Sequence, residues 1–145
     1  MAVAALITWL ITAVGGFVML GMYISGGGHR AAAGARAATP GGTAVGPRTR
    51  LAPALVFTHF GLAALGLILW IVYLVLDSGA LAWVAFVLLL PVAVLGFTML
   101  ARWIPARRSG TVESRFPVPV VIGHGLFAAT TLVLVLLTAA GVGGS

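Results

Sequence analysis

The sequence predicts an all-α membrane protein, a four-transmembrane-helix bundle built from two tandem two-helix repeats. Of its 145 residues, 61% are hydrophobic and only 7% are charged, whereas a soluble domain is about half apolar and a quarter charged. The apolar residues fall into four long runs, and one stretch recurs 80 residues later. This composition excludes an ordinary soluble enzyme and also excludes a disordered chain.

Each of the four runs is long enough to cross the hydrocarbon layer, which takes roughly 20 apolar residues as a helix. In lipid the backbone must satisfy its own hydrogen bonds, so these runs should be helices. Pro91 should kink or loosen the third helix near its middle. We therefore expect a single membrane domain over residues 1–145, with helices at about 3–24, 51–76, 80–104 and 116–140.

The connections between these helices differ in length and composition. Residues 25–50 are rich in Gly, Ala, Thr and Pro and show no apolar periodicity, which predicts a flexible loop. Residues 77–79, Asp-Ser-Gly, predict a tight turn that makes the second and third helices antiparallel neighbours. Residues 105–115 form a polar loop.

The net charge of +6 comes from arginines alone, because the chain has no lysine. Long apolar runs surround the two arginine clusters, so the charge indicates membrane topology and not nucleic-acid binding. Both arginine-bearing loops are predicted to be cytoplasmic, with both termini outside. The composition, rich in Ala, Gly and Arg, favours a GC-rich bacterial genome and hence a bacterial plasma membrane.

Matching stretches in the sequence predict an internal duplication of a two-helix unit. An offset of 80 sets residues 14–24 against residues 94–104, and six of the eleven positions are identical. An offset of 65 then sets His59 against His124. The predicted units are residues 1–78 and 79–145, two hairpins with the same orientation. They would be related by a pseudo-two-fold axis along the membrane normal.

Two histidines lie inside predicted membrane helices at matched positions. His59 follows Arg50 by nine residues, and His124 follows Arg115 by nine residues. At about 1.5 Å of rise per residue, each imidazole lies roughly 12 Å into the same leaflet. Ionisable groups in membrane helices usually face the bundle interior. We therefore expect the two rings to meet across the axis.

Two such imidazoles, on opposite sides of an apolar slot, match what a low-spin haem b requires. Only two histidines lie in the membrane, so one haem per chain is expected, with His59 and His124 binding the iron. No carboxylate lies at that depth, so Thr58 or a backbone carbonyl near a helix start should orient each ring. Small or polarizable residues are predicted to line the pocket, namely Gly16, Gly96, Met19, Met99, Ala63 and Ala128. Cations for the haem propionates would come from Arg50, Arg102 and Arg115.

Other interpretations of the histidines remain open. They would form interhelical hydrogen bonds in a cofactor-free accessory subunit of a larger membrane complex. They would relay protons in a small proton-coupled carrier or channel. His29, beside glycines in the first loop, is expected to be solvated. The chain has no nucleophile–base–acid set, because its two carboxylates, Asp77 and Glu113, lie on opposite sides of the membrane. An electron-transfer or accessory role is therefore favoured over a stand-alone enzyme.

The four-span layout with His59 and His124 resembles small four-helix membrane b-type cytochromes, including the haem-bearing anchor subunits of respiratory oxidoreductases. The resemblance lies in this arrangement, since no longer motif matches. It implies that both histidines are axial ligands and that the protein relays electrons between quinone and other respiratory membrane subunits. Such proteins often hold two haems, whereas this chain has intramembrane histidines for one. The pattern leaves a homo-oligomer open.

Overall fold

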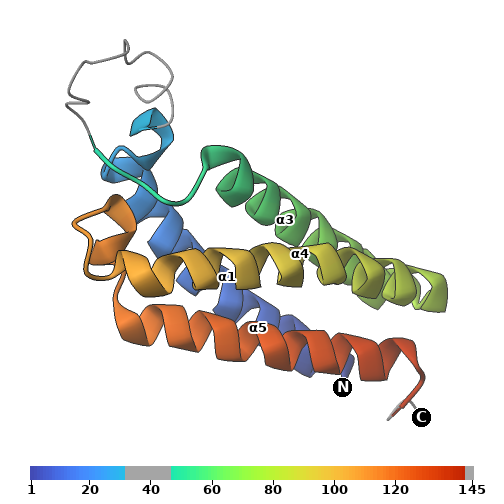
Figure 1. Cartoon of the computed structure of the whole chain (residues 1–145). Helices are drawn as coiled ribbons and strands as arrows, with labels where there is room; N and C mark the ends of the chain where they lie inside the picture. The colour runs from blue at the N-terminus through green and yellow to red at the C-terminus, as the bar shows by residue number, and fades with distance from the viewer. Residues whose placement is uncertain (32–46, 143–145) are drawn as a thin grey trace.

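The structure, a computed structural model, describes residues 1–31 and 47–142 as an antiparallel bundle of four long helices (Figure 1). The helices are α1 (Ala2–Ser25), α3 (Pro53–Leu76), α4 (Gly79–Ala106) and α5 (Val118–Ala139), and a short 3₁₀ helix, η1, spans Val112–Arg115. The described residues form no strand. The predicted all-α, four-helix fold is confirmed, and each helix boundary lies within two residues of its predicted position.

All four helices are long and apolar enough to cross a membrane. Large apolar side chains also point outward, as shown by Val75, Phe97 and Leu126, which are exposed by 77%, 68% and 68%. A water-soluble bundle would not present so much apolar surface. The chain is therefore a multi-pass membrane protein whose outer surface suits contact with lipid. Helix α4 continues through Pro91, as membrane helices often do.

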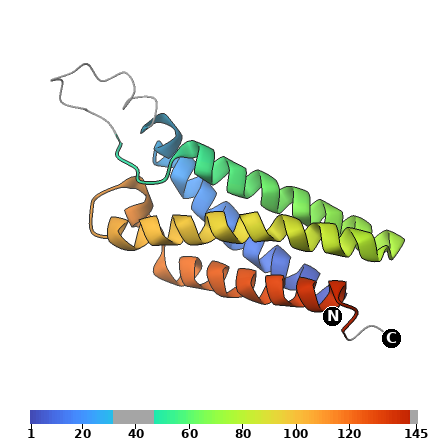
Figure 2. The same ribbon diagram turned by 45° about the vertical axis from the view of Figure 1, so that its right-hand side comes forward.

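The helices form a closed ring in the order α1, α3, α4, α5 (Figure 2). Helix α1 packs mainly on α5, and α3 mainly on α4. The contact between α4 and α5 is less extensive, and that between α1 and α3 is the least extensive of the four. The predicted pseudo-two-fold axis exchanges α1 with α4 and α3 with α5. It therefore superimposes the α1–α5 pair on the α4–α3 pair, and these are the two pairs with the most extensive contacts.

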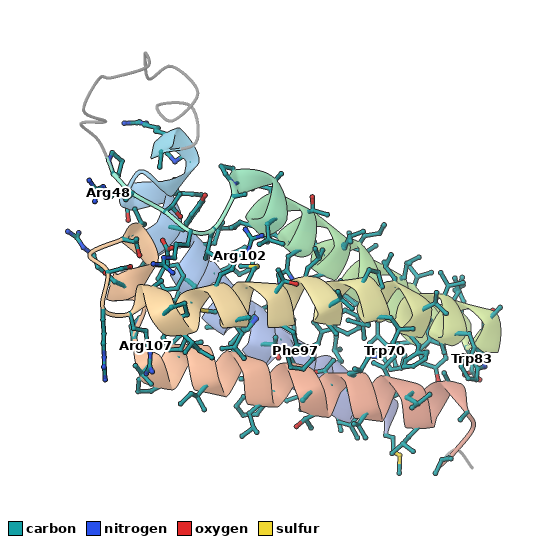
Figure 3. All side chains as sticks on the ribbon, in the orientation of Figure 1. Arg48, Trp70, Trp83, Phe97, Arg102 and Arg107 are labelled. Carbon is teal, nitrogen blue, oxygen red and sulfur yellow. The ribbon has the colours of Figure 1, made fainter. Side chains whose placement is uncertain are left out.

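The two ends of the bundle differ in charge (Figure 3). At the terminal end lie the N-terminus, the end of α5 and the turn at Asp77 (Figure 1), whose left-handed backbone (φ 49°) reverses the chain as predicted. At the opposite end, here called the arginine end, lie residues 26–31, 47–52 and 107–117. Arg36 is outside the described residues. The described arginines at or near the arginine end are Arg30, Arg48, Arg50, Arg102, Arg107, Arg108 and Arg115.

Two buried clusters hold the bundle together. The cluster toward the terminal end is built around Trp70, whose indole N–H donates to the Ala2 carbonyl over 3.3 Å. The cluster toward the arginine end contains Tyr23 and Trp103. The Tyr23 hydroxyl donates to the Leu51 carbonyl over 2.8 Å. The space between the two clusters is occupied by a cavity that residues of both clusters line.

A buried carboxylate joins the two connections at the arginine end. Glu113 is fully buried and accepts hydrogen bonds from the Thr49 hydroxyl at 3.0 Å and the Arg50 backbone N–H at 2.5 Å. The Val112 N–H donates to the Arg48 carbonyl over 2.9 Å. The second end of the predicted loop 25–50 is thus held in place, while residues 32–46 lie outside the described residues.

His29 departs from its expected solvated position. Residues 28–31 form a helical turn after α1, and the His29 ring is only partly exposed. Its Nδ1 atom is inaccessible to water and has no hydrogen-bond partner within the described residues. The expectation of a solvated ring is wrong for its Nδ1 atom, which is buried.

Candidate functional site

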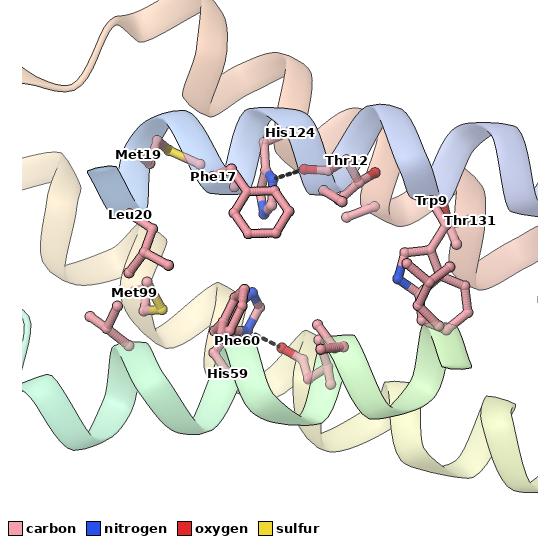
Figure 4. A pocket seen from close by; sticks show the side chains of 18 of the residues that line it. Trp9, Thr12, Phe17, Met19, Leu20, His59, Phe60, Met99, His124 and Thr131 are labelled. Atoms are coloured by element: carbon pink, nitrogen blue, oxygen red, sulfur yellow. Dashed lines mark hydrogen bonds between the residues drawn. The ribbon is translucent and has the colours of Figure 1, made fainter. Parts of the chain in front are cut away.

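The structure brings the two intramembrane histidines together. The ring of His59, from α3, and that of His124, from α5, have centroids 6.3 Å apart and planes inclined by 56°. Both rings line a cavity of about 190 Å³ inside the bundle (Figure 4). A single water needs only about 10–15 Å³ on such a measure. The cavity therefore has room for a much larger group beside the imidazoles.

Each ring is oriented by a backbone carbonyl of the neighbouring helix (Figure 4). His59 Nδ1 lies 3.0 Å from the Val92 carbonyl oxygen on α4, and His124 Nδ1 lies 2.8 Å from the Thr12 carbonyl oxygen on α1. A carbonyl can only accept, so both Nδ1 atoms carry the proton and both Nε2 atoms keep a lone pair. Thr58, proposed from the sequence for this role, is exposed. The expectation of a carbonyl at a helix start is also wrong, since both carbonyls lie in mid-helix.

A glycine one turn after each carbonyl allows this close approach. A Cβ atom on Gly16 would lie 3.3 Å from Cε1 of His124, and one on Gly96 would lie 3.2 Å from Cε1 of His59. Both distances are tighter than ordinary van der Waals contact. Without a side chain at these positions, each imidazole lies flat enough against the helix to reach the carbonyl.

The two half-sites are built from positions that the predicted repeat makes equivalent. Thr12 and Val92 are 80 residues apart, as are the two glycines, and the histidines are 65 apart. Sequence reasoning missed Thr12 and Val92 because they act through their backbones and their side chains differ. Extending the 80-residue offset by two positions before Val14 pairs them, and this signal would have identified both.

Most of the predicted pocket residues line the cavity. They are Gly16, Met19, Met99, Ala63 and Ala128. Gly96 contacts the His59 ring instead of lining the cavity. Thr131, on the same helix face as His124, lines the cavity toward the terminal end, whereas sequence reasoning missed Trp9, Phe17 and Phe60. Apart from the histidines, the lining side chains are apolar except for those of Thr12, Thr131 and Tyr23.

The three predicted propionate-binding arginines do not line the cavity. Arg50, Arg102 and Arg115 are exposed at the arginine end, and Tyr23 and Leu51 close the cavity on that side. Arg102 donates to the Arg50 carbonyl over 3.4 Å, so these two residues lie close together. Both arginines are close in sequence to residues that line the cavity. Met99 lies one turn before Arg102, and Leu51 is next to Arg50.

The candidate ligand set consists of imidazoles alone. Within residues 1–31 and 47–142 no group of three or more His, Cys, Asp or Glu side chains is placed to hold a metal ion. A bare zinc or copper ion would need further ligands. Two imidazoles are sufficient for an iron that a macrocycle already binds.

Comparison with known proteins identifies no relative. No protein-family model matches the chain, and neither a curated protein nor a solved structure shows significant similarity to it. The fold and the histidine geometry are therefore the only basis for a functional proposal.

Proposed function

We propose that this chain is an integral membrane protein that binds one haem b through His59 and His124 and serves in electron transfer or haem handling. The observation that supports it is the pair of Nδ1-anchored imidazoles whose ring centroids lie 6.3 Å apart across a shared cavity. A metal–imidazole bond is about 2.0–2.1 Å long, so two rings on opposite sides of one metal have centres about 6 Å apart. The observed separation fits that requirement.

The residues around the histidines suit this ligand. The Val92 and Thr12 carbonyls hold the Nδ1–H groups, which fixes the tautomer and makes each Nε2 a better electron donor. The cavity lining around the two rings is mostly apolar. A bound haem would supply one-electron redox chemistry, tuned by its axial ligands and surroundings. Binding of the haem carboxylates by Arg102, Arg50 and Arg115 would require these exposed side chains to turn toward the cavity from the arginine end.

Topology forms the second part of the proposal. The seven described arginines at one end support the proposal that this end faces the cytoplasm of a bacterial plasma membrane and that both termini are outside. The matched half-sites support a tandem duplication of the two-helix unit. Quinone and other respiratory membrane subunits are the partners we propose, because electrons must enter and leave the bound group.

The visible spectrum of the purified protein tests the proposal. Wild type should show a Soret band that sharpens on dithionite reduction, with split bands in the green. His59→Gly and His124→Gly should each abolish the low-spin spectrum, and added imidazole should restore it. His29→Ala is the matched control, being the third histidine of the chain and outside the cavity. A haem spectrum that neither glycine variant changes would overturn the ligand assignment.

One observation favours a cofactor-free accessory subunit as the second candidate. Each histidine already joins two helices by a hydrogen bond, His59 joining α3 to α4 and His124 joining α5 to α1. Interhelical hydrogen bonds of this kind contribute about 0.6–2 kcal/mol in membranes. If the protein is such a subunit, the purified protein is colourless and co-purifies with other membrane subunits. The histidine substitutions then lower its stability and change no visible spectrum.

A further inference from the structure

The two seams that the repeat makes equivalent are closed in different ways. The predicted axis exchanges the seam between α1 and α3 with that between α4 and α5, yet α4 and α5 pack more extensively. At the α1–α3 seam, the rings of Phe17 and Phe60 meet edge to face, with centroids 5.6 Å apart and planes at 68°. Figure 4 shows these rings in front of His124 and His59.

The repeat has no such aromatic pair on its other side. Phe17 corresponds to Phe97 by the offset of 80, but Phe60 corresponds to Gly125 by the offset of 65. Phe97 is 68% exposed and does not line the cavity. The α4–α5 seam is thus closed by helix packing, whereas the α1–α3 seam is covered by two side chains.

Phe17 and Phe60 have a second property in common. They are exposed by 58% and 38%, and no other described residue that lines the cavity is classed as exposed. One surface of this pair therefore faces the cavity, while another faces the lipid side of the bundle. No polar side chain contributes to this cover, so a group crossing here would come from the hydrocarbon layer.

Small residues beside the pair leave space for the rings to move. Ala13 precedes Phe17 by four residues, and Ala64 follows Phe60 by four, so each lies one turn away on the same helix face. Both alanines line the cavity. A rotated phenyl ring can therefore lie over a methyl group instead of meeting a large neighbour.

We infer that the α1–α3 seam is a lateral opening to the bilayer, covered by Phe17 and Phe60, through which a flat, lipid-dissolved ring ligand reaches the histidine pair. The identity of that ligand as haem rests on the proposed function. The opening itself rests on the asymmetry of the two seams and on the double-sided exposure of the phenylalanine pair.

Cross-linking across each seam tests the opening. The chain contains no cysteine, so Phe17→Cys with Phe60→Cys introduces two unique thiols, and Phe97→Cys with Gly125→Cys is the matched control. Haem-free protein in vesicles is given haem dissolved in the bilayer, and the low-spin spectrum is followed over time. A cleavable bismaleimide should slow uptake at least tenfold at the α1–α3 seam and less than twofold at the control seam. Cleaving the linker should restore the rate, which separates closure from misfolding. Equal slowing at both seams would overturn the opening.

A readout without haem distinguishes the opening from the proposed function. Ala63→Cys and Ala128→Cys each place one thiol in the cavity wall, on α3 and α5. Adding Phe17→Ala should raise the labelling rate of both thiols by a lipid-soluble maleimide several-fold, while adding Phe97→Ala should not. If no variant takes up haem but labelling follows this pattern, the haem assignment fails and the opening stands. Labelling rates that respond equally to both substitutions would refute the opening.

Discussion

His59 and His124 are held by contacts that correspond position by position, yet the surroundings of the two rings toward the terminal end differ. In the α1–α5 pair, the Thr131 hydroxyl hydrogen-bonds with that of Thr8 over 2.9 Å. The offset of 65 places Gly66 where Thr131 would be in the α3–α4 pair. The two halves therefore agree at the backbone that orients the imidazoles and differ in the side chains that fill the remaining space.

Trp9 explains the difference at Gly66. A Cβ atom on Gly66 would lie 3.1 Å from the indole ring of Trp9, so this ring occupies the place that a side chain would need. The residue equivalent to Trp9 is Leu89, a smaller group. Residues 1–78 thus combine a large ring with a glycine, and residues 79–145 combine a smaller leucine with a threonine. The comparison teaches that the Trp9 ring of the α1–α5 pair fills space that Gly66 leaves open in the α3–α4 pair.

The arginine end shows the largest departure from symmetry. Glu113 is fully buried, and the offset of 65 places Arg48 at the equivalent position. A single carboxylate therefore accepts hydrogen bonds from the other connection, through Thr49 and Arg50. The first prediction removes this carboxylate, which has no counterpart at the equivalent position. The later predictions substitute residues at positions that the predicted repeat makes equivalent.

Glu113→Ala should be the most destabilising of the substitutions considered in this section. It removes two acceptor atoms from the part-buried donors on Thr49 and Arg50, and the loss of an acceptor costs a fully buried donor about 1–3 kcal/mol. We expect a loss of about 3 kcal/mol in the free energy of unfolding, measured by denaturant titration of the detergent-solubilised protein. Glu113→Gln, which keeps one acceptor oxygen, should lose less. Arg115→Ala, at an exposed neighbouring position, is the control, and an equal loss there would contradict the role of the carboxylate.

Gly16→Leu and Gly96→Leu test whether the two half-sites are equivalent. Each side chain would push an imidazole off its carbonyl, and overpacking of this kind costs about 1–3 kcal/mol. We expect both variants to lose about 2 kcal/mol of stability, equal within error, together with the low-spin haem spectrum of the proposed site. Gly21→Leu is the control, since a Cβ there meets no atom within 4 Å. A large effect at only one of the two glycines would show that the half-sites are not equivalent.

The fold could be predicted from the sequence because membrane helices obey a simple rule. Long apolar runs without acidic residues must be helical in lipid, and this alone placed every boundary within two residues. The burial of Glu113 could not be predicted in this way. A glutamate in a polar loop is normally solvated, and its partners, Thr49 and Arg50, lie more than sixty residues earlier in the chain.

The histidine pair could be anticipated because the repeat equates positions 59 and 124 at the same depth. The groups that orient the rings could not be found from side-chain chemistry, since Thr12 and Val92 contribute only carbonyls. The sequence predicts Arg50, Arg102 and Arg115 near the pocket because the number of residues along a helix gives the depth of each position in the membrane. The direction of a side chain around the helix depends on packing, and in the structure these arginines are exposed and do not line the cavity.

Thr131→Val sharpens the comparison at the position where one half is polar and the other has glycine. The substitution keeps the shape of the side chain and removes the hydroxyl that joins α5 to α1 through Thr8. Interhelical hydrogen bonds inside membranes average about 0.6 kcal/mol, so a loss of that size is expected in the same unfolding titration. Thr130→Val is the matched control, because its exposed hydroxyl bonds only to the Leu126 carbonyl of its own helix. If the two variants lose the same stability, the threonine pair contributes no more than a local bond. The α1–α5 pair would then be stabilised, like the α3–α4 pair, by packing and by the hydrogen bond of its histidine.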